Sequence, residues 1–93
     1  MPFVEQTPRP FVRQDVESLR PNQIGVYGLF NQGEWVYVGK GDIRERLLAH
    51  LNDPSILSRR PTHWVGEVTQ GEPSARERQL QLELRPSCNL RVG

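Results

Sequence analysis

The sequence predicts a small α+β domain in which a three-stranded, mostly antiparallel sheet is flanked by helices in the order β-β-α-β-α. Two segments rich in Val, Tyr, Phe and Trp, residues 24–30 and 34–39, stand on either side of a short turn, as the strands of a hairpin do. Residues 43–51 and 74–84 space their apolar side chains as helices do, and residues 63–69 between them have the composition of a strand.

Length and composition limit the protein to one modest core. With 93 residues, 35% of them hydrophobic, we expect a single domain, with residues 1–22 as an N-terminal arm and residues 23–93 as the folded part. The net charge of +1 excludes a strongly basic protein that coats nucleic acid. No apolar run approaches the roughly 20 residues of a membrane span, and the start lacks a secretory signal pattern. Cys88 is the single cysteine, which excludes an internal disulfide and favours a cytoplasmic location.

The arm is predicted to be irregular. It contains four prolines and no sustained hydrophobic period. At most a short helical turn is expected near residues 15–19, and Pro21 ends it because the residue before a proline disfavours the helical conformation.

The first two strands are predicted to form a hairpin that brings two tyrosines together. Asn31-Gln32-Gly33 suits a three-residue loop with Gly33 in the left-handed conformation. That register pairs Tyr27 directly with Tyr37, so both phenols stand side by side on one face of the sheet. A four-residue loop would place them on opposite faces.

The first helix is predicted to begin after Asp42, which is its N-cap. Glu45, three residues later, completes the pattern of a capping box, and the sequence Asn52-Asp53-Pro54 ends the helix. The apolar stripe of this helix consists of Ile43, Leu47 and Leu51.

Arg46 and His50 share one flank of that stripe. At 100° per residue Arg44 lies about 160° away from Arg46, so only one of the two arginines can point into a given cleft. The arginine with a histidine beside it is Arg46. The simpler interpretation is that Arg46 and His50 lie on a solvated face of the helix.

The second helix is predicted to begin at Ser74 as N-cap and to end before Pro86. Glu77 lies on the same face as Leu80 and Leu84. A carboxylate on an apolar face is desolvated unless it meets a cation or a metal. The alternative is structural, with Glu77 as the partner of Ser74 in a capping box.

Taken in order, these residues resemble the GIY-YIG endonucleases, whose core topology is also β-β-α-β-α. The similarity is greatest to the N-terminal incision domain of the bacterial excision-repair nucleases, and it covers about 65 of the 93 residues. Arg46 follows Tyr37 by nine residues, one fewer than in the family pattern, so the turn at residues 40–42 is expected to be short. The pattern comprises Gly25-Val26-Tyr27, Tyr37-Val38-Gly39, Lys40, Arg46, His50, Glu77, Pro86 and Asn89.

The resemblance implies a metal-dependent endonuclease that hydrolyses one strand of DNA. One divalent metal, Mg²⁺ or Mn²⁺, would be held by Glu77 as its sole protein ligand, with water and phosphate oxygens completing the coordination. Tyr27 would act, directly or through a water, as the base that prepares the attacking water. A phenol with a pKa of about 10 needs a nearby cation to serve as a base at neutral pH.

The other motif residues would contact the phosphate or support the site. Tyr37 and Arg46 would donate to phosphate oxygens, for which the planar guanidinium is well suited. His50 and Lys40 would assist with phosphate contact or proton transfer. Asn89 would hold the strand ends and the loop geometry.

Contacts to DNA are expected from the basic stretch between residues 40 and 60. One such stretch predicts weak affinity, so we expect a homodimer, a partner protein, or a branched or distorted DNA substrate to add contacts. A second hypothesis is a nuclease-like module without turnover that binds nucleic acid or a protein as a subunit. A third is an α+β domain whose motif residues are only structural. The expected DNA-contacting residues are Lys40, Arg44, Arg59 and Arg60.

Overall fold

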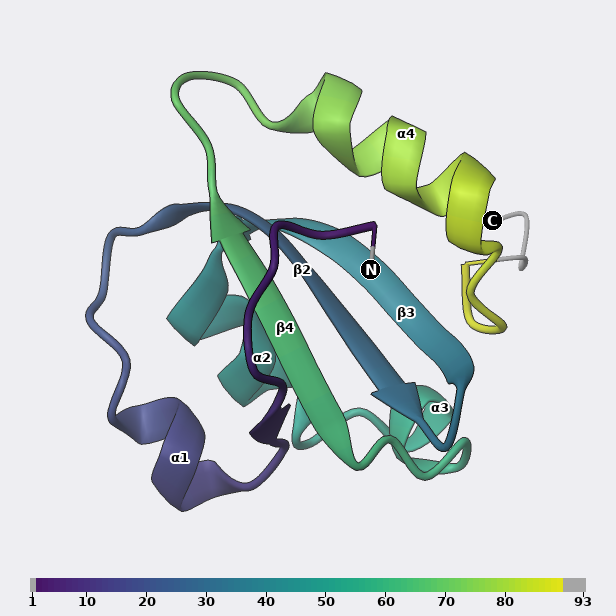
Figure 1. Ribbon diagram of the computed structural model, residues 1–93. Coiled ribbons are helices and arrows are strands. Elements are labelled where there is room, and N and C mark those ends of the chain that lie inside the picture. Colours follow the sequence, from purple (N-terminus) through teal and green to yellow (C-terminus); the bar gives the residue numbers. More distant parts are fainter. Residues whose placement is uncertain (1, 90–93) are drawn as a thin grey trace.

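The computed structural model describes residues 2–89. The predicted order β-β-α-β-α is present in it, with an additional strand and helix before it and a short helix in the middle (Figure 1). The elements are β1 (Arg9–Pro10), α1 (Arg13–Glu17), β2 (Ile24–Asn31), β3 (Glu34–Asp42), α2 (Ile43–His50), α3 (Pro54–Leu57), β4 (His63–Val68) and α4 (Ser74–Leu84).

The strands form one antiparallel sheet in the order β1-β4-β2-β3, which confirms the α+β class. The prediction of three strands was wrong, because the arm contributes β1, where Arg9 pairs with Trp64 and Pro10 with His63. Proline has no N–H to give to a ladder and is therefore confined to edge strands, and β1 is an edge strand.

The sheet separates two hydrophobic cores. One face is covered by α1, α2 and α3, with Leu29 and Leu47 among its fully buried side chains. On the other face Phe3 from the arm and Leu80 from α4 pack on Val26. In Figure 1 the arm crosses in front of the sheet and α2 lies behind it. The domain therefore has three layers, with the sheet between α1, α2 and α3 on one face and the arm and α4 on the other.

The arm is more ordered than predicted. Residues 13–17 form α1, close to the expected helical turn but earlier in the chain. Phe3, Phe11 and Val16 are buried, at 2%, 6% and 0% exposure. Their burial gives an otherwise irregular, proline-rich segment the hydrophobic contacts that fix it on the sheet.

The hairpin between β2 and β3 has a different register from the predicted one. Its loop consists of two residues, Gln32 and Gly33, because Asn31 pairs with Glu34. Both loop residues have positive φ angles, 28° and 93°, as expected of the primed turns that close two-residue hairpins. The left-handed conformation predicted for Gly33 is confirmed, whereas the three-residue loop was wrong.

A β-bulge lies beyond this turn. The register shifts between Leu29 and Phe30, so Leu29 pairs with Tyr37 while Phe30 pairs with Trp35. Val36 is the extra residue, and its side chain is fully buried in the core beneath α2. A bulge directs side chains differently from a regular ladder, and here it places both Val36 and Tyr37 against the same core.

The two long helices begin differently. The N-cap of α2 is Asp42, whose side chain accepts a hydrogen bond from the backbone N–H of Glu45, as predicted. In α4 the N-cap is Pro73, and Ser74 is the first helical residue, so the predicted cap was wrong by one position. The side chain of Glu72 instead accepts from the backbone N–H of Ser74.

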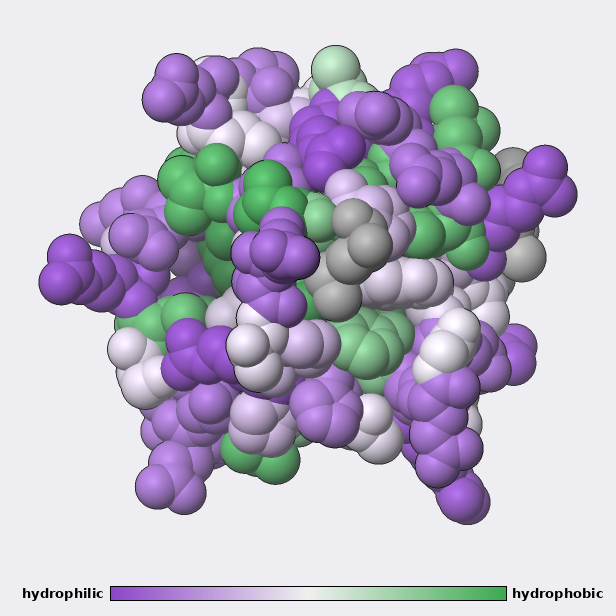
Figure 2. All heavy atoms as spheres, viewed as in Figure 1, coloured by the Kyte–Doolittle hydropathy of each residue, from purple (hydrophilic) through white to green (hydrophobic). Residues whose placement is uncertain are grey.

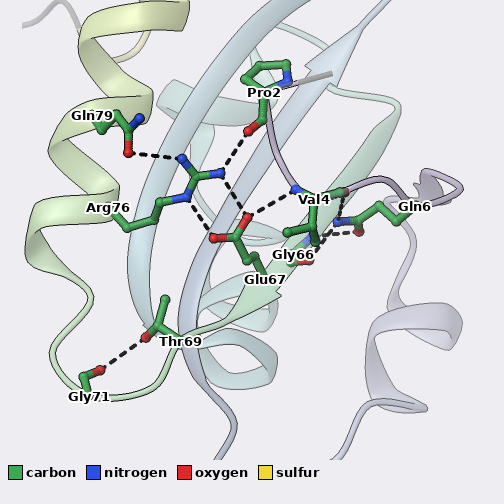
Figure 3. Close-up of polar contacts among 9 residues, drawn as sticks. All are labelled: Pro2, Val4, Gln6, Gly66, Glu67, Thr69, Gly71, Arg76 and Gln79. Carbon is green, nitrogen blue, oxygen red and sulfur yellow. Dashed lines mark hydrogen bonds and ion pairs between the residues drawn. The ribbon is translucent and has the colours of Figure 1, made fainter.

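An ion pair between Glu67 of β4 and Arg76 of α4 connects three parts of the chain (Figure 3). Arg76 Nε and Nη2 donate to the two carboxylate oxygens at 2.7 and 3.0 Å. The same Nη2 donates to the carbonyl of Pro2, and the Glu67 carboxylate accepts from the N–H of Val4. The arm, the sheet and α4 are thereby joined at one half-buried point.

Within residues 2–89 no helix combines the length and the apolar character needed to cross a membrane. Figure 2 shows hydrophilic side chains around the outline of the molecule and hydrophobic atoms gathered in separate groups on this face. The most exposed of the large hydrophobic side chains are Leu82 on α4, at 67%, and Val68 on β4, at 58%.

Arg76→Ala is expected to lower the free energy of unfolding by about 2 kcal/mol, because it leaves the partly buried Glu67 carboxylate without its cation. Urea unfolding followed by circular dichroism measures the change. Arg78→Ala is the matched control, since Arg78 is exposed on the same helix, and it is expected to change stability by less than about 0.5 kcal/mol. Equal losses in the two variants would contradict the role assigned to the ion pair.

Candidate active site

Tyr27 is paired with a glycine on each of the two neighbouring strands. It is on the central strand β2 and pairs with Gly39 of β3 on one side and with Gly66 of β4 on the other. A Cβ atom on Gly39 would lie 2.5 Å from the Tyr27 hydroxyl and 2.7 Å from the ring of Tyr37. Only glycine leaves room there for both rings, and Tyr27 is consequently fully buried.

Tyr37 is the diagonal neighbour of Tyr27 on the same face of the sheet. Direct pairing was predicted, but Tyr37 pairs with Leu29, and the two tyrosine ring centroids are 6.2 Å apart. The shared face was therefore predicted correctly and the register wrongly. Tyr37 is half-buried, so it is the more accessible of the two phenols.

His50, at the end of α2, packs against both tyrosines. Its ring centroid lies 5.5 Å from that of Tyr27 and 4.8 Å from that of Tyr37. Its Nε2 is 2.7 Å from the Tyr27 hydroxyl, with which it forms a hydrogen bond. At 4% exposure it does not lie on a solvated helix face.

Arg46 lies one helical turn before His50 and is exposed. Burial raises the pKa of Tyr27 and the positive charge of Arg46 acts to lower it, which places the guanidinium in the electrostatic neighbourhood of that phenol. The aliphatic part of its side chain passes Gly41, where a Cβ would lie 3.3 Å from Arg46 Cγ. Gly41 has a φ of 126°, which favours glycine, and it leaves room for Arg46. The turn expected at residues 40–42 was wrong, because these residues belong to β3 and α2 follows the strand directly.

Burial controls the protonation of this cluster. Desolvation raises the pKa of Tyr27 well above its ordinary value, and the neighbouring Tyr37 raises it further, while Arg46 opposes the shift. Desolvation also raises the pKa of Tyr37. Burial, assisted by the positive charge of Arg46, lowers the pKa of His50 to about 4. At neutral pH the cluster therefore consists of two phenols, a neutral imidazole and one guanidinium cation.

Glu77 lies on the first turns of α4, half-buried. Desolvation raises the pKa of its carboxyl, and the positive charge of Lys40 acts in the opposite direction. Its charge also affects the pKa values of Tyr27 and Tyr37, which places it in the electrostatic neighbourhood of both phenols. The predicted capping box with Ser74 does not form, because α4 has no side-chain cap at its N-cap position.

The residues around Glu77 fit a hard divalent cation held through water. Among residues 2–89, ion pairs within 4.0 Å involve Asp15, Glu17, Glu67 and Glu72, and Glu77 takes part in none of them. In the same part of the chain no three of the His, Cys, Asp and Glu side chains converge on one point. A single half-desolvated carboxylate suits Mg²⁺, which retains several waters and uses few protein ligands.

The outer edge of β3 is held in place by the end of the described chain. Asn89 Oδ1 accepts from the N–H of Val38 at 2.6 Å, and Gln81 Nε2 donates to the carbonyl of the same residue at 3.0 Å. The N–H groups of Ser87 and Cys88 bond the carbonyls of the two residues before Tyr37. Both backbone groups of Val38, the residue between Tyr37 and Gly39, are thereby satisfied.

The predicted DNA-contacting residues are in separate places. Lys40 is exposed on β3 and lies against Ser74 and Glu72 at the start of α4. Arg44 lines a cleft together with Trp64 and Leu19, and none of the tyrosine cluster lines that cleft. The backbone carbonyls of Arg59 and Arg60 accept from Asn31, at the hairpin end of the sheet. Val26, which pairs with Lys40, is about 17 Å from Asn31 along the strand.

The structure thus brings together Tyr27, Tyr37, Arg46 and His50, with Glu77 close enough to influence both phenols electrostatically. Sequence reasoning missed Gln81 and Gly66. A glycine inside a strand pattern signals a close approach of other groups, and that signal was available for Gly66. The spacing of Gln81, one turn after Glu77, was the corresponding signal on α4.

No protein-family model, no curated protein and no solved structure matches this chain. The resemblance to GIY-YIG endonucleases therefore stays a prediction from the sequence motif.

The buried His50 is expected to make stability depend on pH. Its pKa is about 4 in the folded protein against 6.5 ordinarily, so between these values the unfolded chain binds more protons. The contribution of neutral His50 is complete above pH 6.5 and is lost as the pH falls towards 4, by up to about 1.4 kcal/mol per pH unit. Urea unfolding across this range measures it.

His50→Gln is expected to flatten this dependence because glutamine does not titrate. His63→Gln is the matched control, since His63 is exposed, and it should leave the steep dependence intact. A wild-type slope that survives in His50→Gln would show that other groups cause it.

Proposed function

We propose that this protein is a divalent-metal-dependent DNA endonuclease that hydrolyses a phosphodiester bond. The observation that supports the proposal most strongly is the contact between Tyr27 and His50 beside Tyr37 and Arg46. Packing of a structural core does not require two phenols, an imidazole and a guanidinium to share one small volume. Proton transfer at an anionic centre does require such groups.

In this proposal Arg46 and Tyr37 bind the scissile phosphate. Both are accessible, since Arg46 is exposed and Tyr37 is partly exposed. The guanidinium of Arg46 pairs with two phosphate oxygens, and the Tyr37 hydroxyl donates to one of them. When Arg46 turns towards the phosphate it moves away from the Tyr27 hydroxyl, which then faces the attacking water.

Tyr27 and His50 then act as a proton relay. The water transfers a proton to the Tyr27 oxygen while the phenolic proton passes to Nε2 of neutral His50, 2.7 Å away. The water oxygen forms a bond to phosphorus, the bond to the leaving sugar oxygen breaks, and that oxygen takes a proton from solvent. The relay avoids a free phenolate, which the raised pKa of Tyr27 disfavours.

Substrate binding favours this transfer. The low pKa of His50 has two causes, burial and the positive charge of Arg46. A bound phosphate neutralises Arg46, which removes the second cause and raises the pKa of His50. The imidazole therefore becomes a better proton acceptor when the substrate is in place.

Glu77 is the residue that would hold the metal, through its carboxylate and bound waters. When bound, the divalent ion neutralises charge that builds up on the phosphate and on the departing oxygen. Lys40 lies near Glu77, as its effect on the carboxyl pKa shows, and it contributes a positive charge to the same region. Asn89 supports the site by fixing the strand that carries Tyr37.

Nicking of supercoiled plasmid by the purified protein at low salt, with Mg²⁺ or Mn²⁺, tests the proposal. Tyr27→Phe is expected to slow nicking by about 10²–10⁴-fold because it removes the group that relays the proton. Glu77→Ala and EDTA are each expected to abolish nicking.

Glu83→Ala is the matched control for Glu77→Ala, because Glu83 is an exposed carboxylate on the same helix. It is expected to nick at the wild-type rate. A wild-type protein inert on both plasmid and branched DNA would refute the proposed enzymatic activity. It would favour the alternative, a nuclease-like subunit that binds nucleic acid or a protein without turnover. Nicking that persists in Glu77→Ala would refute the role given to that carboxylate.

A further inference from the structure

A groove runs along the outer flank of α4, beyond the edge of β3. Its volume is about 440 Å³, and it lies between the C-terminal half of the helix and the segment that follows it. The residues that line it are Arg78, Gln81, Leu82, Arg85, Pro86 and Asn89. None of them was singled out as a DNA-contacting residue.

The groove adjoins the strand that carries Tyr37. Two of its lining residues, Gln81 and Asn89, are those that bond the backbone of Val38, next to Tyr37. Glu77 lies one helical turn before Gln81 on the same helix. A strand of DNA that runs from the site past Glu77 towards the C-terminal end of α4 would reach the groove.

The charge of the groove is positive. Two of its six lining residues are arginines and none is a carboxylate. Arg78 and Arg85 are exposed, and neither belongs to an ion pair within 4.0 Å among residues 2–89. Arg78 lies on α4 and Arg85 is the C-cap residue that follows the helix, and both line the same groove.

Three other cationic side chains of the molecule are already engaged by neighbouring groups. Arg76 is occupied by Glu67 and Pro2, Arg9 by Asp15 and the ring of Trp64, and Lys40 by Glu72. Arg78 and Arg85 hold no such contacts in the described part of the chain and stand beside a concave surface. Guanidinium groups in that situation bind phosphate oxygens.

We propose that this groove binds the DNA backbone that flanks the scissile phosphate, with Arg78 and Arg85 each contacting one phosphate. The inference rests on the proposed endonuclease function and adds to it the direction in which the substrate leaves the site. It also adds phosphate contacts to those expected from Lys40, Arg44, Arg59 and Arg60.

The test measures the affinity of the full chain for a fluorescein-labelled DNA duplex by anisotropy, with EDTA present so that no strand is cut. The double variant Arg78→Gln, Arg85→Gln is expected to bind at least about tenfold more weakly at low salt. Its plot of log Kd against log salt is expected to be shallower by about 2, since each lost contact to duplex phosphate removes about 0.9 from the slope.

Arg13→Gln, Arg20→Gln is the matched control, with the same change in net charge at two exposed arginines of the arm. It is expected to keep the wild-type slope. Equal weakening of DNA binding in both double variants would show an effect of net charge alone and would overturn the proposal that the groove binds DNA. Wild-type affinity in the groove variant, or no binding by the wild type, would overturn it as well. Thermal unfolding of all three proteins by circular dichroism establishes that they are folded.

Plasmid nicking by the same proteins separates this inference from the proposed function. If the wild type nicks and the groove variant matches its affinity and KM, the proposal that the groove binds DNA is refuted and the proposed endonuclease activity is supported. If the wild type binds DNA through the groove without nicking, DNA binding by the groove is supported and the endonuclease activity is refuted. When both are right, the groove variant has a raised KM and an unchanged kcat.

Discussion

The ion pair of Glu67 and Arg76 determines where α4 lies, and α4 carries Glu77 and the arginine-lined groove. No regular secondary structure connects this helix to the sheet, so its position depends on Leu80 in the core, on the bond from Gln81 to β3 and on this pair at its first turns. The ion pair is bidentate and its side chains are only partly exposed. An ion pair of this kind contributes more to stability than one on the surface does. Because Pro2 and Val4 bond the same pair, the start of the chain helps to position a candidate metal ligand 75 residues later.

The tyrosine cluster depends on a different constraint, the absence of side chains around it. Gly39 pairs with Tyr27 and has no side chain in the space that the Tyr27 ring occupies, and the ring is fully buried. The same burial raises the pKa of Tyr27 and lowers that of His50. Shape and protonation are therefore consequences of one feature, and a larger residue at position 39 would alter both together.

Features that depend on contacts between residues close in sequence could be predicted, and features that depend on distant residues could not. The N-cap of α2 was predictable because Asp42 bonds a backbone group three residues away. Strand β1 was not, because two residues that include a proline carry no local signal and their partner is β4. The shared face of Tyr27 and Tyr37 was predicted through a wrong register. The shorter loop and the bulge at Val36 each shift the pairing by one residue, and together they restore the side-chain alternation. The contact of His50 with Tyr27, the position of Arg46 over Gly41 and the ion pair of α4 all depend on tertiary packing that no short pattern encodes.

The segment 87–89 has a consequence for the behaviour of the protein in a crowded solution. An uncovered edge strand is a template on which another chain can add a strand, and this is a common route to aggregation. In β3 the outward backbone groups of Trp35, Val36 and Val38 are already bonded by Ser87, Cys88 and Asn89, with Gln81 completing the set. The residues that fix the strand beside the candidate site also close that edge to other molecules. Loss of these few residues would expose a valine-rich edge, so protection from self-association and the geometry of the site depend on the same short segment.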